Sequence, residues 1–167
     1  ANDFVLVGPA ADPAGIRGSD ASAALRAIAA TRAPFVSRGD DSGTHVRERA
    51  LWVDAGGLPI DTASWYMSIG QGMGNALRIA SERSGYTLTD RATFMSLAET
   101  LFLEVLVEGG AELENVYSVM TTARGRNGRG ADALAEWLAS EPGQTLIGAF
   151  GVERFGRSLF EPRARQP

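Results

Sequence analysis

Short apolar segments alternate with longer amphipathic segments along this chain. Residues 4–7 are apolar and end at the turn pair Gly8-Pro9, which is typical of a buried strand. Residues 35–37 and 86–89 are also predicted to form short strands. Segments of about ten to fifteen residues with helical spacing of apolar side chains separate these strands. The alternation predicts an α/β fold with a mainly parallel sheet and flanking helices.

The sequence also predicts two further helices and one further strand. The spacing of Val46, Ala50 and Val53 predicts a helix with these side chains on its buried face. A second helix is expected to begin at residue 90 and to continue toward residue 107. Residues 116–122 are strand-like.

The charge and cysteine content exclude several classes of function. The chain has 16 basic residues, all of them arginine, against 20 acidic residues, and its net charge of −4 is unlike that of a nucleic-acid-binding protein. Cysteine is absent and His45 is the sole histidine, which excludes disulfides, thiolate nucleophiles and metal sites rich in cysteine or histidine. We therefore expect no nucleic-acid partner, no cofactor, no bound metal and no catalysis.

The segment SRGDDSGT has the composition of an oxyanion site at the start of a helix. A helix N-terminus presents unpaired N–H groups and about half a positive charge, both of which favour an anion. Gly43 lets a ligand approach the backbone, and Ser42 and Thr44 add hydroxyl donors. Arg38 adds a permanent charge and a planar set of donors that suits tetrahedral oxyanions. Asp40 can hold that guanidinium or accept a proton from a protonated ligand.

A plainer interpretation of the same segment stays open. Ser42 or Thr44 would then only cap the helix, since serine and threonine are favoured N-cap residues. Arg38 would pair with Asp40 or Asp41 at the surface, and no ligand would be involved.

Further candidate residues lie on either side of this segment. Ser37 precedes it and is a weaker candidate for ligand contact, and His45 either tunes anion binding with pH or is a solvated side chain. A second glycine-rich helix start contains Gly70, Gly72 and Gly74. These glycines either contribute to anion binding or allow close packing of the helix that follows, and both interpretations stay open.

The motif Arg38-x-Asp40-x-Ser42-Gly43-Thr44 resembles the anion-binding motif of the phosphate-binding proteins of ABC transporters. The longer segments SRGDDSGTHVRERALW, WYMSIGQGMGNAL and YTLTDRATF are more similar to the tungstate-binding proteins of the same large group. NDFVLVGPAADPAGI and AEWLASEPGQTLIGAFG extend the resemblance over nearly the whole chain.

The resemblance implies a type II periplasmic-binding-protein-like fold, in which a tetrahedral oxyanion is enclosed between two lobes and passed to a membrane permease. Arg38, Ser42, Gly43 and Thr44 match the ligand-contacting motif of the family, and Asp40 matches the residue that orients the arginine. The implied ligand is tungstate or molybdate, the implied partner is an ABC transporter permease, and the implied location is periplasmic or extracytoplasmic. The alternatives are a phosphate receptor and a ligand-sensing regulatory module of the same fold.

The chain departs from the family at its beginning. In the family, a threonine- and serine-rich anion-binding loop precedes the segment NDFVLVGP, with which this chain nearly starts. The resemblance assigns residues 1–115 to the second lobe with its entry hinge, and residues 116–167 to the return hinge and C-terminal helices. The chain is then either a piece of a longer protein or a half-protein that a partner or self-association completes. In both cases the 167 residues alone are expected to bind the anion weakly or undetectably.

Overall fold

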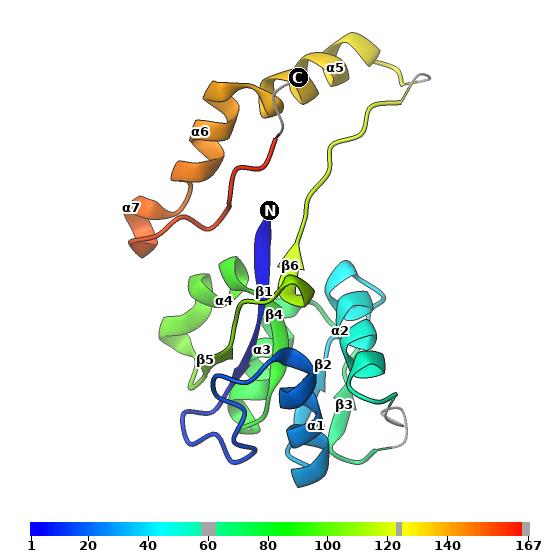
Figure 1. Ribbon diagram of the computed structural model, residues 1–167, viewed down its shortest axis with the longest axis vertical. Helices are drawn as coiled ribbons and strands as arrows, with labels where there is room; N and C mark the ends of the chain where they lie inside the picture. The colour runs from blue at the N-terminus through cyan, green and yellow to red at the C-terminus, as the bar shows by residue number, and fades with distance from the viewer. Residues whose placement is uncertain (58–62, 123–124, 165–167) are drawn as a thin grey trace. The chain divides into compact units, whose positions relative to one another are not determined.

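The computed structural model describes residues 1–57, 63–122 and 125–164 of the chain (Figure 1). The chain divides into two compact units. The larger unit is Asp3–Glu114, and the smaller unit comprises Ala1–Asn2 and Asn115–Pro167. No helix in the described ranges is long and apolar enough to cross a membrane.

Two groups of strands form the centre of the larger unit. In the first group, β1 (Asn2–Gly8) lies between β4 (Thr87–Asp90) and β5 (Glu104–Val107), and the short β6 (Glu114–Asn115) also pairs with β1. In the second group, β2 (Phe35–Ser37) pairs with β3 (Tyr66–Ser68). The N–H of Val36 donates to the carbonyl of Tyr86 at 2.8 Å, which links β2 to the start of β4.

The strands are mixed in direction, so the prediction of a mainly parallel sheet is wrong. β2 and β3 are parallel, and an isolated parallel bridge joins Phe35 to Tyr86. β1 is antiparallel to both β4 and β5. An apolar pattern identifies a buried strand, but its direction depends on the path of the connections around it, which the pattern does not contain.

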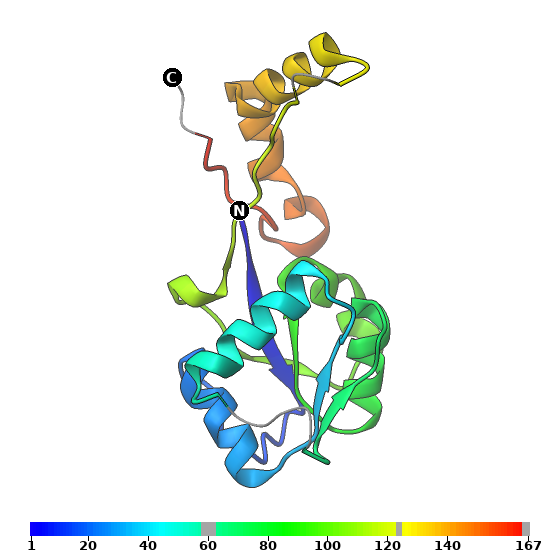
Figure 2. The same cartoon turned by 90° about the vertical axis from the view of Figure 1, so that its right-hand side faces the viewer.

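Helices cover both faces of β1, which explains its continuous apolar sequence. The four helices of the larger unit are α1 (Ala21–Thr31), α2 (Gly43–Asp54), α3 (Met73–Glu82) and α4 (Arg91–Leu97). Phe4 and Leu6 pack in a core cluster with buried residues of α1 and α2. Val5 and Val7 point to the opposite face and pack with buried residues of α3 and α4. Figure 2 shows the two helix pairs on opposite sides of the strands.

Aspartate side chains cap two helices, and the cap at Asp90 lies at the start predicted for its helix. Asp20 accepts a hydrogen bond from the N–H of Ala23 at 2.7 Å, and Asp90 accepts one from the N–H of Thr93 at 2.8 Å. The helix after Asp90 ends at Leu97, and two short 3₁₀ turns follow at Ala98–Thr100 and Ala111–Leu113. The predicted continuation toward residue 107 is therefore wrong, because the last residues of that stretch pair with β1 as strand β5.

The buried face of α2 differs from the predicted one. Val46 and Val53 are 61% and 68% exposed. The core is contacted instead by the face that carries His45, Glu48, Leu51 and Trp52. Two of these four side chains are polar, so a count of apolar residues selects the wrong face of the helix.

The smaller unit is helical in its described part. It contains α5 (Gly128–Ala139), α6 (Glu141–Ala149) and α7 (Val152–Phe155). Ser140 caps α6, and Ala1 and Glu161 exchange two backbone hydrogen bonds of 2.8 and 2.7 Å. Residues 116–122 form no strand, so that prediction is wrong; several of their apolar side chains are exposed and no described strand pairs with them.

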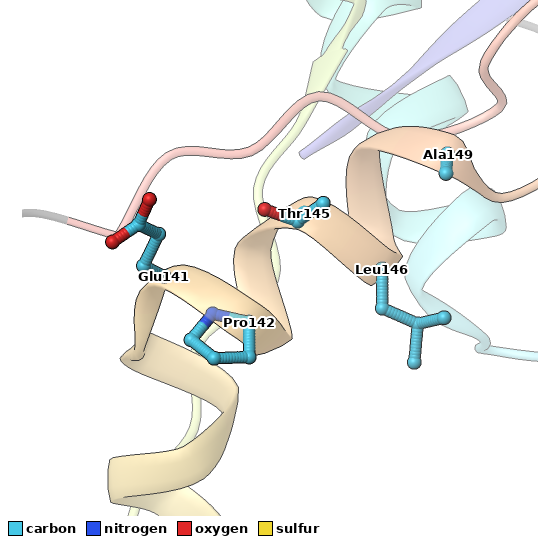
Figure 3. A pocket seen from close by; sticks show the side chains of 5 residues that line it. All are labelled: Glu141, Pro142, Thr145, Leu146 and Ala149. Atoms are coloured by element: carbon cyan, nitrogen blue, oxygen red, sulfur yellow. The ribbon is translucent and has the colours of Figure 1, made fainter.

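A shallow hollow lies along α6 in this unit (Figure 3). Its lining residues are Glu141, Pro142, Thr145, Leu146 and Ala149. The single charged group among them is a carboxylate, and the other side chains are small or apolar. This lining lacks the positive charge and the converging donors that an oxyanion requires.

Candidate functional site

The loop that connects β2 to α2 forms the candidate site in the larger unit. β2 ends at Ser37, residues 38–42 form the loop, and α2 begins at Gly43. Ser42 is the N-cap residue, and its hydroxyl oxygen accepts a hydrogen bond from the N–H of His45 at 3.4 Å. The sequence places an oxyanion-type motif here, and the structure gives that motif the strand, loop and helix start that an anion site uses.

Two residues of the loop have left-handed backbone conformations. Gly39 has a φ of 63° and Asp41 a φ of 55°. A Cβ atom at Gly39 would collide with the hydroxyl of Ser68 on β3, so this position requires glycine. Asp41 is held by His45, whose Nδ1 accepts a hydrogen bond from the Asp41 N–H at 3.1 Å. His45 is buried, so the interpretation of a solvated side chain is wrong.

Asp40 holds the guanidinium of Arg38. Its Oδ2 accepts hydrogen bonds from Nε and Nη2 of Arg38 at 3.2 and 2.5 Å. Its Oδ1 accepts a hydrogen bond from the N–H of Ser42 at 3.2 Å. Asp40 therefore joins the arginine to the cap of α2 and fixes the charge beside the helix start.

These contacts also determine the ionisation of Asp40. Partial burial by itself would raise the pKa of Asp40, but hydrogen bonds from Ser42 and Arg38 and the charge of Arg38 outweigh it and lower the pKa to about 2. Asp40 is thus a carboxylate at neutral pH, and its oxygens are already engaged as acceptors. It is poorly placed to accept a further proton from a ligand.

Several donors at the start of α2 remain open. In the described part of the chain, the N–H groups of Gly43 and Thr44, the Thr44 hydroxyl and Nη1 of Arg38 make no hydrogen bond. A Cβ atom at Gly43 would meet no atom within 4 Å, so the backbone there is accessible. Together with the positive end of the helix dipole, these groups can bind a tetrahedral oxyanion.

The two glycine-rich segments lie side by side. The N–H of Ile69 donates to the carbonyl of Ser37 at 3.1 Å, and the N–H of Gln71 donates to the carbonyl of Arg38 at 3.0 Å. Gly70 has a φ of 63°, and Gly72 is the N-cap of α3 without a side-chain cap.

Close packing does not explain the glycines near the start of α3. A Cβ atom at Gly72 would meet nothing within 4 Å, and one at Gly74 would make only an ordinary contact of 3.8 Å with Leu97. A role for Gly70, Gly72 and Gly74 in anion binding remains a prediction.

A polar cluster below the loop is not predicted by the sequence pattern. Ser37, the weaker candidate ligand, is fully buried and points its hydroxyl into the protein interior without a hydrogen-bond partner among the described residues. Glu48 is 1% exposed and accepts a hydrogen bond from the Tyr66 hydroxyl at 2.6 Å. The sequence does contain one signal for this cluster: Glu48 lies three positions before Leu51 and four before Trp52, which places it on the same helix face as these two apolar residues.

The fold agrees with a comparison against known protein families. Residues 1–142 match the family described as the PBP superfamily domain, the superfamily of periplasmic-binding-protein-like folds. The chain belongs to the PBP superfamily. This membership confirms the fold that the sequence resemblance implies, apart from the strand directions corrected above.

Individual members of the superfamily give a closer comparison. The chain is 42% identical to the tungstate-binding protein TupA of Peptoclostridium acidaminophilum, over 98% of this chain and 59% of that protein. It is also 42% identical to a protein of Haloferax volcanii named as a putative ABC transporter anion-binding protein, over 98% of this chain and 49% of that protein.

A solved structure matches the architecture as well as the sequence. The tungstate-binding protein TupA of Desulfovibrio alaskensis G20 superposes with a TM-score of 0.82 at 41% identity, covering 98% of this chain and 68% of that one. The chain thus spans about half to three fifths of the length of these two curated relatives.

Proposed function

We propose that this chain is the anion-binding part of a solute-binding protein of an ABC importer, with tungstate or molybdate as its ligand. The observation that carries the proposal is the set of open donors at the start of α2 beside an arginine that Asp40 holds in place. Two of the three similar proteins named above are tungstate-binding proteins, and this supports the choice of ligand. The proposed partner is a membrane permease, and the proposed location is extracytoplasmic.

The ionisation of Asp40 favours tungstate or molybdate over phosphate. Phosphate still carries a titrating proton near neutral pH, with a second pKa of about 6, and is bound best where an acceptor is free. Asp40 is ionised, but its oxygens already accept hydrogen bonds from Arg38 and Ser42. A fully deprotonated dianion needs donors alone, and donors are what this loop leaves open.

The discrimination between anions is tested by ligand-induced stabilisation of the chain. A ligand that binds the folded state raises the unfolding temperature according to its concentration and dissociation constant. We expect sodium tungstate to raise the unfolding temperature more than sodium phosphate does at equal concentration and ionic strength, corresponding to at least about tenfold tighter binding. Equal or greater stabilisation by phosphate would reject tungstate and favour the phosphate receptor.

A ligand-sensing module of the same fold is the second candidate function, and it would use the same loop. A permease and an ATPase encoded beside this gene would support uptake, whereas a fused DNA-binding segment would support sensing. Both candidates place the anion at Arg38, Ser42, Gly43 and Thr44.

A further inference from the structure

A buried polar cluster lies directly beneath the proposed oxyanion site. Its members are Ser37 at the end of β2, Glu48 and Trp52 on α2, and Tyr66 on β3. The Tyr66 hydroxyl donates to Oε1 of Glu48 at 2.6 Å. Glu48 is 1% exposed, so its carboxyl group is removed from water at a position where apolar side chains are the rule.

Two polar atoms of the cluster have no hydrogen-bond partner among the described residues. They are Oγ of Ser37 and Nε1 of Trp52, both fully buried. Both nevertheless act on the Glu48 carboxyl and favour its ionised form. A hydroxyl and an indole N–H are donors, so both can stabilise Glu48 when it loses its proton. The cluster can accommodate a neutral carboxyl group as well as a carboxylate.

The balance between these two states lies near neutral pH. Burial raises the pKa of Glu48 to about 7, and Tyr66, Ser37, Arg49 and Trp52 partly oppose that effect. Among the described residues that act on the carboxyl, Arg49 is the one charged group. The pKa of Tyr66 is raised by burial and by Glu48, so the tyrosine remains a donor throughout.

The cluster lies next to Arg38 and within two helical turns of Gly43, the two parts of the anion site. Ser37 is covalently joined to Arg38. Glu48 follows Gly43 by five residues, which corresponds to about 7.5 Å along the helix axis. A charge on Glu48 therefore lies close to the helix start at which the anion is proposed to bind, on a side chain that is itself removed from water.

We propose that Glu48 is a positioning residue that makes anion binding dependent on protonation. Its neutral form, bound to Tyr66, supports Ser37 and the end of β2 beneath Arg38. When it releases its proton to water, the carboxylate repels the bound dianion through the first turns of α2. This inference rests on the proposed function, because it concerns the same site.

The sign and size of the effect follow from charge alone. Ionisation adds one negative charge at roughly 10 Å from a dianion, and at an effective dielectric constant of about 20 this repulsion weakens binding to the ionised form by more than a hundredfold. With a Glu48 pKa of about 7, about a tenth of the chains are still protonated at pH 8, which limits the loss between about pH 6 and about pH 8 to about tenfold. Affinity should therefore fall as the pH rises through the titration of Glu48. His45 on the same helix is a second titratable group near the site, and its contribution must be separated from that of Glu48.

The test is a titration of the chain with sodium molybdate between about pH 6 and about pH 8, followed through the amide NMR signals of Gly43 and Thr44. The wild-type chain should lose about tenfold in affinity across this range. Glu48→Gln keeps an oxygen that accepts from Tyr66 and cannot ionise, so its affinity should stay constant near the low-pH value of the wild type.

Two matched variants control for other charges. Asp54→Asn removes an exposed acid from the far end of α2, and His45→Gln removes the second titratable group; both should retain the pH dependence of the wild type. A wild-type affinity that does not change with pH, or an unchanged pH dependence in Glu48→Gln, would overturn the proposal. Loss of the pH dependence in His45→Gln would assign it to the histidine and would also overturn it.

A second readout covers the case in which Glu48→Gln fails to fold. The carboxyl carbon of Glu48 in the wild-type chain should titrate near neutral pH, and saturating molybdate should raise its pKa, because coupling between proton and anion is reciprocal. A pKa that molybdate leaves unchanged would contradict the inference while leaving the proposed function intact. The absence of any molybdate response at Gly43 and Thr44 would instead reject the proposed function, and this inference with it.

Discussion

Replacing Arg38 with alanine is expected to abolish measurable tungstate binding. Arg38 is the one cation of the motif, and Asp40 fixes it through two hydrogen bonds. Each hydrogen bond to a charged group contributes about 1.5–3 kcal/mol, so loss of the guanidinium should weaken binding by more than a hundredfold if it donates about two bonds to the anion. Titration calorimetry of the wild-type and variant chains measures this loss.

A control separates the role of Arg38 from the general effect of charge. Arg78→Ala removes an exposed arginine from α3 and changes the net charge by the same amount. It should bind tungstate as the wild type does. If Arg38→Ala kept its affinity, or if both variants lost it equally, the anion would not be bound at the start of α2.

Replacing Trp52 with alanine is expected to have the largest effect on stability. Trp52 is 1% exposed, and its ring lies 5.2 Å from that of Phe35, 5.7 Å from that of Trp65 and 6.2 Å from that of Tyr66. Removal of a buried tryptophan costs about 3–5 kcal/mol, through lost burial and the cavity that remains. Chemical denaturation followed by circular dichroism measures the change in the free energy of unfolding.

The matched control is an aromatic side chain of the same unit that lies on the surface. Phe102 is 87% exposed, so Phe102→Ala should change the free energy of unfolding by less than about 0.5 kcal/mol. Comparable losses in the two variants would contradict the assignment of Trp52 to the core beneath the site. A small loss for Trp52→Ala would contradict it as well.

The sequence predicts most helix starts because their signals are local. Asp20 and Asp90 cap helices through bonds to residues three positions ahead, and such caps depend on the chain within one turn. The buried face of α3 carries Met73, Ala76 and Leu77 at the apolar spacing of a helix. Here apolar side chains alone make up the buried stripe.

The buried face of α2 could not be predicted in this way. His45 and Glu48 are buried because Asp41 and Tyr66 supply hydrogen-bond partners, and the partner of Glu48 lies 18 residues away in the chain. A hydrophobicity pattern assigns polar residues to the surface, and it therefore favoured Val46 and Val53. The prediction of strand directions was wrong for a related reason, since these directions depend on pairing between distant segments.

In the proposed site, too, local contacts are predicted by the sequence and contacts between distant segments are not. The order of arginine, aspartate, serine, glycine and threonine identifies the loop, because Asp40 bonds to both Arg38 and Ser42 within five residues. The contacts of this loop with residues 69–71, and the cluster around Glu48, involve distant segments and become visible only in the structure.

The most direct test of the central claim is an amide NMR titration of the uniformly ¹⁵N-labelled chain with sodium tungstate at constant ionic strength. The open donors should respond first, so the N–H signals of Gly43 and Thr44 should shift and saturate together, even where affinity is weak. The N–H of Gly109, between β5 and β6, should stay unchanged. Saturable shifts elsewhere without any at Gly43 and Thr44, or no saturable shifts at all, would contradict an oxyanion site at the start of α2.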